Sequence, residues 1–514
     1  MNVAELLAGP VAERPDAPAL VERVGGRTRA TTFAALDAAA RATAALLVAR
    51  GVRAGDAVLF FAPPSVELYA ALAAVFRVGA VAMFVEPSAG RGVLDAACAM
   101  WPPAALVASR KAHLLRLVSR AIRRIPVKLV TRGWVPSAAR LPLGGADAPL
   151  HPCDADAPAL LTFTSGSTGT PKAAVRTHGI LRAQLDALRP LAARAGEREL
   201  VSLPIVVLVN LAAGATTVLP DADLRRPGAI DPAPVLAQLA EHDVGRVTAS
   251  PAFLERLVDA STDGALARLA SVVTGGGPVF PDLVARVKRA ARDARIVAVY
   301  GSTEAEPIAH VRDDELSPDD HAATRAGRGL LAGTPDACVS LRIIHARPDA
   351  PLGPLGAAEL EALRCAPGEP GEIVVAGAHV VRGYLRGIGD AETKVRVDDV
   401  VWHRTGDAGY LDERGRLWLL GRAAAAIVDA RGTLYPFAAE AAARAMLGPR
   451  RVAVVAHHGR RVLVVERGAD VDVPTLLGAL SWAHLDDVAS VDTMPTDRRH
   501  NAKIDYAAVR AMLR

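Results

Sequence analysis

Residues 160–172 read Leu-Leu-Thr-Phe-Thr-Ser-Gly-Ser-Thr-Gly-Thr-Pro-Lys, a short apolar run that passes directly into a loop of small and hydroxylated residues. The same order, an apolar run, then a polar or glycine-rich break and commonly a helical pattern, recurs at 244–258, from 271 to Pro281, and at 296–301. Parallel βα units read this way in sequence, so we expect an α/β fold. Because loops after parallel strands converge at one edge of the sheet, these loops are expected to share one site.

The loop itself has the composition of a phosphate cradle. Small residues allow close backbone approach, hydroxyls and amides donate to phosphate oxygens, and a lysine adds a point charge. Pro171 and Ala173 flank that lysine where a Walker A loop needs glycine and a hydroxyl residue, so a P-loop NTPase is disfavoured. An isolated loop of this kind is most often a flexible polar turn. The candidate phosphate-binding residues are Thr164, Ser165, Gly166, Ser167, Thr168, Gly169 and Lys172.

The bulk composition describes a folded protein of more than one domain. The chain has 514 residues, of which 51% are hydrophobic and 22% charged, and its net charge is +5. Aromatic residues make up 4%, which leaves few platforms for stacking bases, so no nucleic-acid partner is expected.

Nothing near the start of the sequence has the order of a signal peptide, and the four cysteines show no metal-ligand spacing. A cytoplasmic location is therefore expected. The stretch Val201–Leu219 carries no charge over a length that could nominally span a bilayer. Pro204, Asn210 and Gly214 interrupt it, and we interpret it as a buried strand and loop with no transmembrane segment.

One stretch, Lys111–Arg132, is strongly basic. It places arginines at helical spacing against leucine, valine and isoleucine, which predicts a basic amphipathic helix. A solvated helix face is the ordinary interpretation. A role at a membrane surface or against an anionic partner is the alternative.

The sequence pattern changes from about residue 371. Alternating runs at 372–376, 409–411 and 416–420, with a turn signal at 412–415, predict a small β subdomain over about 371–421. After Gly421-Arg422 the chain is expected to form an α+β module with a hairpin over 452–465 and helices near 437–447 and 506–513. We place the domain boundary at 421–424, which gives a large domain over 1–421 and a mobile C-terminal domain over 424–514.

Four motifs in this order resemble the acyl-adenylate-forming superfamily of acyl-CoA synthetases, luciferases and peptide-synthetase adenylation domains. The first is the loop at 164–172, and the second is Tyr300-Gly301-Ser302-Thr303-Glu304. The third runs from Arg404-Thr405-Gly406-Asp407 to Gly421-Arg422, and the fourth is Lys503 within Asn501-Ala502-Lys503-Ile504. The resemblance spans about residues 10–512. It implies ATP-dependent activation of a carboxylic acid as acyl-AMP.

The resemblance also implies a role for each matched residue. Thr303 and Glu304 would lie at the phosphates, with Glu304 holding Mg²⁺, a cation that prefers carboxylate oxygen. Tyr300, with the glycine loop Gly275, Gly276 and Gly277, would face adenine, although core packing is the ordinary role of such a tyrosine. Asp407 would accept the ribose hydroxyls, reinforced by Arg422. Lys503 would bridge the substrate carboxylate and the α-phosphate during adenylation.

The chain departs from the superfamily at two places that bear on the acceptor of the acyl group. Ala424 stands where an aspartate or lysine hinge is usual, and Ile427-Val428 stands where an Ile-Lys usually assists thioester formation. Details at 333–344, at Trp402-His403-Arg404 and at 499–504 are most similar to olefin β-lactone synthetases. That finer resemblance implies that a substrate β-hydroxyl attacks the adenylate within the same molecule, an arrangement of high effective molarity that needs no outside acceptor.

Alternative functions are also compatible with the sequence. A fatty acyl-CoA synthetase, or an acyl-AMP ligase that loads a carrier protein, is the main alternative, and a degenerate protein that binds nucleotide without turnover is a minor one. The segments Pro204–Leu219 and Val247–Pro251 are expected to line a pocket for an aliphatic acid. His178 and His403 adjoin signature motifs, but the general base is left unassigned.

Overall fold

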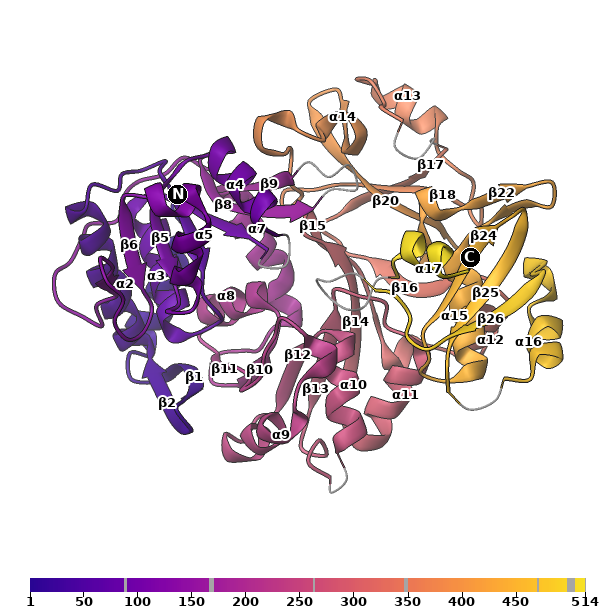
Figure 1. Cartoon of the computed structure of the whole chain (residues 1–514), viewed down its shortest axis with the longest axis horizontal. Coiled ribbons are helices and arrows are strands. Elements are labelled where there is room, and N and C mark those ends of the chain that lie inside the picture. The colour runs from indigo at the N-terminus through magenta and orange to yellow at the C-terminus, as the bar shows by residue number, and fades with distance from the viewer. Residues whose placement is uncertain are drawn as a thin grey trace. The chain divides into compact units, whose positions relative to one another are not determined.

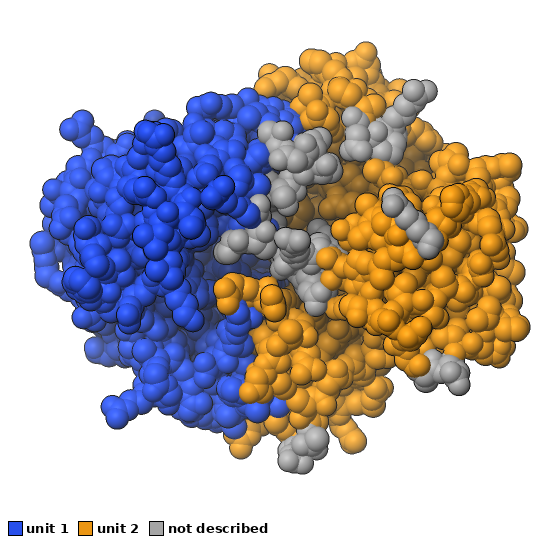
Figure 2. Space-filling model, viewed as in Figure 1, with its two compact units in different colours: residues 1–224, 233–248, 378–390 blue, residues 225–232, 249–377, 391–514 orange. Residues whose placement is uncertain are grey.

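The computed structural model describes residues 1–86, 90–165, 171–261, 264–345, 350–468, 471–496 and 504–513. The chain forms two compact units, coloured separately in Figure 2. Unit 1 contains residues 1–224, 233–248 and 378–390, and unit 2 contains residues 225–232, 249–377 and 391–514.

Unit 1 contains a sheet of seven strands in the order β7-β6-β5-β3-β4-β8-β9, of which β5, β6, β8 and β9 are labelled in Figure 1. Its strands are parallel except for the last pair, in which β9 runs back beside β8. Their bounds are β3 Ala57–Phe61, β4 Val81–Val85, β5 Pro103–Ala108, β6 Val127–Val130, β7 Ala139–Arg140, β8 Pro158–Ser165 and β9 Pro171–Thr177. The helices that follow these strands include α3 Val66–Val78, α4 Gly90–Met100, α5 Leu115–Val118, α6 Arg120–Arg124 and α7 His178–Leu188. The α/β fold class is confirmed.

A second group of strands in unit 1 is ordered β12-β10-β11-β1-β2. Strands β10, β11, β12 and β1 are parallel, and β2 closes the edge as a hairpin with β1. The bounds are β1 Pro18–Val24, β2 Arg27–Thr32, β10 Arg198–Val201, β11 Thr216–Val218 and β12 Arg246–Ala249. The remaining helices of this unit are α1 Ala8–Glu13, α2 Phe33–Ala49, α8 Pro204–Ala213 and α9 Pro232–Glu241.

Nine strands of unit 2 belong to one sheet: eight lie in the order β17-β18-β20-β21-β16-β15-β14-β13, and β19 pairs with β20. Their bounds are β13 Ser271–Gly275, β14 Arg295–Ser302, β15 Ala305–Arg312, β16 Leu330–Pro335, β17 Ser340–Ile344, β18 Gly371–Ala376, β19 Lys394–Val397, β20 Val400–Leu411 and β21 Leu417–Arg422. The helices are α10 Pro251–Ala260, α11 Pro281–Ala290, α12 Pro318–Arg325, α13 Ala357–Ala362 and α14 Asp390–Thr393. The predicted strands at 271–274 and 296–300 and the predicted turn at 412–415 are confirmed.

The C-terminal part of unit 2 is an α+β module. A hairpin of β22 Ile427–Asp429 and β23 Gly432–Leu434 precedes α15 Pro436–Leu447. Strands β24 Val452–His457, β25 Arg460–Glu466 and β26 Asp487–Val491 form a three-stranded sheet. The same module contains the helices α16 Val473–Ala479 and α17 Tyr506–Met512. The expected hairpin over 452–465 and both expected helices are therefore present. The proposed domain boundary at 421–424 falls at the end of β21, where Ala423–Ala425 form a 3₁₀ turn.

Two expectations of the sequence are wrong. Val201–Leu219 is not strand and loop alone, because Pro204 occupies the first turn of α8 and Gly214, at φ +73°, caps its end. Lys111–Arg132 does not form one helix. Ser119 has extended φ and ψ angles of −111° and 119° and separates α5 from α6, where its hydroxyl accepts the amide of Ile122. No helix of the described residues is long and apolar enough to cross a membrane.

Candidate active site

The tip of the β14–β15 hairpin carries the second motif. Ser302 pairs with Ala305 across the hairpin, so Thr303 and Glu304 form its two-residue turn. The amide of Glu304 donates to the Ser302 hydroxyl at 3.3 Å, which orders the turn. Tyr300 and Gly301 lie in the last part of β14. The turn therefore presents its carboxylate at the carboxyl end of a central strand, where ligands bind in open α/β sheets.

The glycine loop lies beside the same strand end. Gly275 is the last residue of β13 and pairs in parallel with Val299, and Gly276 and Gly277 follow it. A Cβ atom on Gly275 would lie 2.7 Å from the Val299 carbonyl oxygen. Only glycine permits this close approach of the two strands. Two of the loops expected to share one site therefore lie at the same edge of one sheet.

Asp407 connects the second and third motifs. The hydroxyl of Tyr300 donates to Asp407 Oδ2 at 2.7 Å, although the two residues are 107 positions apart. Asp407 also pairs with Arg422 across β20 and β21, with 3.3 Å between Arg422 Nε and Asp407 Oδ1. Arg422 Nη1 donates in addition to the Thr405 carbonyl oxygen at 2.9 Å. One carboxylate thus receives a phenol on one oxygen and faces a guanidinium with the other.

The electrostatics of this group follow from its burial. Desolvation, followed by the Asp407 charge, holds the pKa of Tyr300 well above its ordinary value. Tyr300 therefore stays protonated and acts as a donor at any physiological pH. The result is a carboxylate whose orientation is fixed before any ligand binds.

Lys172 lies in unit 1, at the start of β9, where it pairs with Thr164 of β8. Its side chain packs against Gly389, a residue with φ of +95°. A Cβ atom on Gly389 would lie 2.5 Å from Lys172 Cδ and 2.7 Å from Nζ. No local sequence signal singles out Gly389, because its contact with Lys172 joins segments more than 200 residues apart.

The remaining predicted phosphate-loop residues, Gly166, Ser167, Thr168 and Gly169, and the predicted catalytic Lys503 lie outside the described residues. Thr164 and Ser165 form the end of β8, immediately before that loop. The first motif therefore begins within β8, and its last two residues, Pro171 and Lys172, begin β9.

The two histidines beside the motifs are both buried and neutral. Burial lowers the pKa of His178 to about 4, and its Nδ1 accepts the amide of Val3 at 3.1 Å. His403 Nδ1 lies 3.2 Å from both Lys394 Nζ and the Thr393 carbonyl oxygen. Burial, followed by the Lys394 charge, lowers the pKa of His403 to about 3. Neither histidine is available as a proton acceptor for a substrate, so the general base stays unassigned.

Lys394 is a residue that the sequence analysis missed. It is 8% exposed and lies in β19, opposite His403 of β20. The charge of Glu304 acts on the same histidine and opposes part of its pKa depression. The buried ammonium of Lys394 thus lies beside β20, the strand that carries the third motif, and its charge and that of Glu304 act on the same histidine. A lysine in a short edge strand carries no sequence signal of such a position.

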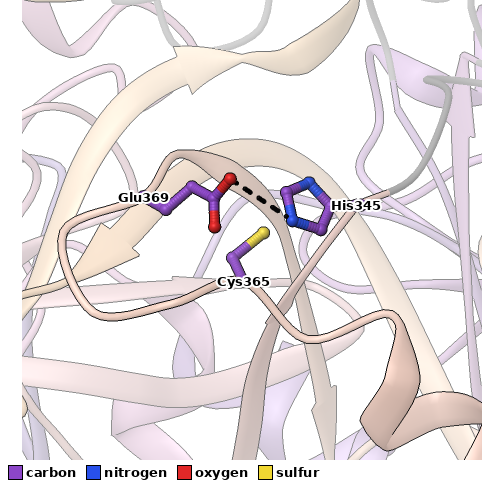
Figure 3. A group of neighbouring side chains, drawn as sticks. All are labelled: His345, Cys365 and Glu369. Atoms are coloured by element: carbon purple, nitrogen blue, oxygen red, sulfur yellow. Dashed lines mark ion pairs between the residues drawn. The ribbon is translucent and has the colours of Figure 1, made fainter.

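One group of side chains in the described parts of the chain could hold a metal ion (Figure 3). The ligand atoms of His345, Cys365 and Glu369 lie within 4.8 Å of one another. His345 Nε2 and Glu369 Oε1 form an ion pair at 3.4 Å, and the Cys365 thiol donates to the Pro370 carbonyl oxygen. Burial, with the Glu369 charge, raises the pKa of Cys365 to about 11, so the thiol is protonated. We interpret the group as an ion pair above a buried thiol.

The Glu304 carboxylate fits a magnesium ion better than the group of His345, Cys365 and Glu369 does. Mg²⁺ is commonly bound through one or two carboxylates, with substrate phosphates and water completing its octahedral shell. Glu304 supplies one carboxylate at a hairpin tip that is only half buried. A nitrogen and sulfur set such as His345 and Cys365 favours softer metals.

The chain is similar to several known proteins. The model of a family described as AMP-binding enzyme matches residues 8–385. The chain is 34% identical to an olefin beta-lactone synthetase of Stenotrophomonas maltophilia, over 98% of this chain and 96% of that protein. It is 32% identical to an olefin beta-lactone synthetase of Xanthomonas campestris with the same coverage. Among solved structures, the amide bond synthetase McbA of Marinactinospora thermotolerans superposes with a TM-score of 0.79 at 23% identity, covering 100% of this chain and 99% of that one.

Proposed function

The chain belongs to the AMP-binding enzyme family, and on that premise we propose that it converts a β-hydroxy carboxylic acid into a β-lactone. Members of this family use ATP to activate a carboxylic acid as its acyl-adenylate. To this activation step the proposal adds that the acid carries a β-hydroxyl and that the adenylate closes to a β-lactone. The observation that carries it is the 34% identity, along nearly the whole chain, to an olefin beta-lactone synthetase.

The proposed reaction has two bond exchanges. A carboxylate oxygen attacks the α-phosphorus of ATP, and pyrophosphate leaves. The β-hydroxyl oxygen then attacks the acyl carbon, the bond from that carbon to the AMP oxygen breaks, and AMP leaves while the hydroxyl proton passes to solvent. The second attack is intramolecular, so it draws on the high effective molarity of a nucleophile held beside its target.

The described geometry supports the proposed nucleotide contacts. Asp407, oriented by Tyr300 and Arg422, would accept the two ribose hydroxyls, and the Gly275–Gly277 loop would leave room for adenine. Glu304 would hold Mg²⁺, which supplies charge neutralisation at the phosphates. Lys172 and Lys503 would supply point charges at the phosphates and at the reacting carboxylate.

The absence of an external acceptor is supported by the residue at position 428. Val428 lies in β22 with 75% of its surface exposed, at the place where the superfamily commonly has the lysine for thioester formation. A valine there offers neither charge nor hydrogen bond. That arrangement is consistent with an acceptor that is part of the substrate.

The proposed aliphatic nature of the acid is supported by one face of α8. Ile205, Leu208 and Ala212 lie at helical spacing and are half buried, whereas Val207 and Leu211 are fully buried in the core. A half-buried apolar stripe is suited to contact an alkyl chain. Val247 and Ala249 of β12, expected to line the same pocket, are fully buried.

The test is to incubate the purified protein with Mg-ATP and a racemic long-chain β-hydroxy acid, without coenzyme A, and to follow AMP and organic product. We expect sustained AMP release together with β-lactone. The matched control is the acid of equal chain length without the hydroxyl, which should support pyrophosphate exchange but give no lactone. AMP that appears only after addition of coenzyme A or a carrier protein would identify an ordinary acyl ligase instead.

Substitution of Lys503 by alanine separates the chemistry from nucleotide binding. Removing one electrostatic stabiliser of a transition state costs a factor on the order of 10²–10³ in rate. We expect Lys503→Ala to lower the rate of pyrophosphate exchange by at least that factor while ATP still binds, as measured by calorimetry. A rate within threefold of wild type would remove Lys503 from the mechanism and would favour a protein that merely binds nucleotide.

A further inference from the structure

A basic and apolar surface of unit 1 plays no part in the proposed chemistry. No aspartate or glutamate occurs between Asp95 and Asp147, a stretch that contains nine lysines and arginines. Its exposed apolar side chains include Leu117 at 72%, Val118 at 58% and Trp134 at 75%. We call the surface formed by these three residues with Lys111, Leu114, Arg120 and Arg124 the 111–134 surface. It includes residues of the short helices α5, labelled in Figure 1, and α6.

The backbone beneath this surface is well anchored. Ile122 and Ile125 are 1% and 3% exposed and pack into the core of the seven-stranded sheet. Arg123 donates to the carbonyl oxygens of Arg116 and Leu117, both at 2.9 Å. Arg116 in turn donates to the Pro136 carbonyl oxygen at 2.9 Å, which joins α5 to the segment that carries Trp134. The exposed side chains are therefore presented by a fixed scaffold.

The exposed charges of this surface are not neutralised. Among the described residues, Lys111, Arg120 and Arg124 have no ion-pair partner and are exposed. Arg132, in the same stretch, differs, because it pairs with the carboxylates of Glu22 and Glu67 at 2.6 Å and 2.7 Å. Asp95, the acid that precedes this stretch in the sequence, accepts the hydroxyl of Ser119 at 2.6 Å. The surface thus combines uncompensated positive charge with apolar tips.

This combination departs from a solvated helix face, on which the apolar residues would point inward. Here Leu117 and Val118 point outward at the end of α5, and Ser119 interrupts the helix immediately after them. These side chains lie on a helix of four residues and on the segment that carries Trp134. They offer a wedge of the kind that inserts between lipid headgroups, with aliphatic and indole side chains flanked by lysine and arginine.

We propose that the 111–134 surface binds the enzyme peripherally to membranes that contain anionic phospholipid. Leu117, Val118 and Trp134 would enter the headgroup layer, while Lys111, Arg120 and Arg124 contact lipid phosphates. The proposed function enters only as the reason why membrane binding would be useful, because a long-chain hydroxy acid and its lactone partition into lipid. Binding itself requires neither ATP nor acid, so the two proposals can fail separately.

The test uses the full-length protein, without ATP or acid, and vesicles of phosphatidylcholine with or without an equal share of phosphatidylglycerol. We expect the protein to sediment with the anionic vesicles and not with the neutral ones. The bound fraction should fall as the salt concentration rises from about 0.1 M towards 1 M, because salt screens surface charge over that range. Trp134 is the strongly exposed member of the five tryptophans, so binding should shift the fluorescence to the blue. Trp134→Phe should lose most of that shift. Equal binding to both kinds of vesicle, or to neither, would overturn the proposal.

A charge-matched pair of variants locates the contact. The double substitution of Arg120 and Arg124 by serine should weaken binding to anionic vesicles roughly 30-fold, from about 1 kcal/mol for each basic residue near an anionic surface. The same change at Arg50 and Arg53, which are exposed after α2, should leave it within twofold. Both proteins should retain wild-type unfolding temperatures and pyrophosphate exchange. Equal losses in both, or capture of an acidic protein or nucleic acid by a surface that ignores vesicles, would refute the assignment to lipid.

Discussion

At the scale of single residues, Asp407 is the point at which three parts of the sequence meet. Its carboxylate accepts the Tyr300 hydroxyl, faces Arg422, and receives its own orientation from a backbone amide that donates to the Thr405 hydroxyl at 3.0 Å. Hydrogen bonds to an ionised acceptor contribute about 1.5–3 kcal/mol each. Preorganisation of this kind would lower the cost of the proposed ribose binding, because the acceptor is already ordered before a ligand binds.

Removal of the Tyr300 hydroxyl tests that preorganisation. Tyr300→Phe keeps the ring and deletes the bond to Asp407, and the loss of about 1.5 kcal/mol corresponds to a roughly tenfold rise in the Michaelis constant for ATP. The measurement is pyrophosphate exchange as a function of ATP concentration. Tyr410→Phe is the control, because it deletes a comparable bond, 2.8 Å long, to the Arg328 carbonyl oxygen elsewhere in unit 2. Equal shifts for the two variants would show that Tyr300 acts only through stability.

Glu304 carries a prediction about the metal. Glu304→Gln preserves the size of the side chain but removes the negative charge that a hard cation requires. We expect the Mg²⁺ concentration that gives half-maximal pyrophosphate exchange to rise at least tenfold at saturating ATP. Glu413→Gln, in the exposed turn between β20 and β21, should leave that concentration unchanged. An unaltered magnesium requirement in the Glu304 variant would place the ion elsewhere.

At the scale of elements, the approach of the 387–389 segment to β9 determines the space available to Lys172. Gly387 and Gly389 have φ values of +69° and +95°, so alanine strains the backbone at both positions. At Gly389 the added methyl would also enter the space of the Lys172 side chain, whereas at Gly387 the nearest atom, Asp390 Oδ2, lies 3.7 Å away. The two glycines thus separate backbone strain from displacement of the lysine.

We predict that Gly389→Ala lowers kcat/KM for ATP at least tenfold relative to Gly387→Ala. The measurement is pyrophosphate exchange, with urea unfolding of both variants to confirm that their losses of stability are similar. If Lys172 is a phosphate ligand, the defect should appear mainly in the Michaelis constant for ATP. Indistinguishable kinetics of the two alanine variants would mean that the position of Lys172 is not limiting.

The elements also show what the sequence can and cannot predict. Strands such as β13 and β14 could be predicted because a short apolar run and a glycine break are local signals. The helix α8 could not, because an uncharged run has no periodicity that distinguishes helix from strand. The break at Ser119 depends on a cap and on a bond to Asp95, which is 24 residues away. The bond from Tyr300 to Asp407 likewise depends on the order of strands in the sheet, which no local pattern specifies.

At the scale of the whole molecule, one buried carboxyl group ties the C-terminal module together. Glu440 of α15 is 3% exposed and accepts the Val454 amide at 2.9 Å and the Tyr506 hydroxyl at 2.9 Å. Tyr506 begins α17, directly after an isolated bridge between Thr496 and Ile504. The same carboxyl therefore links a central helix, a strand and the segment that leads back from the predicted catalytic lysine.

The burial of Glu440 predicts how stability depends on pH. Desolvation raises its pKa from 4.5 to about 7, so the folded state keeps a proton that the unfolded state loses near 4.5. Stability should therefore fall as pH rises from about 4.5 to 7 and level off above, by roughly 3 kcal/mol from this group. Glutamine cannot ionise, so the free energy of unfolding of Glu440→Gln, taken relative to that of the wild type, should be higher at pH 8 than at pH 5. The measurement is urea unfolding of both proteins at the two values, and parallel pH profiles would mean that Glu440 is already ionised in the folded molecule.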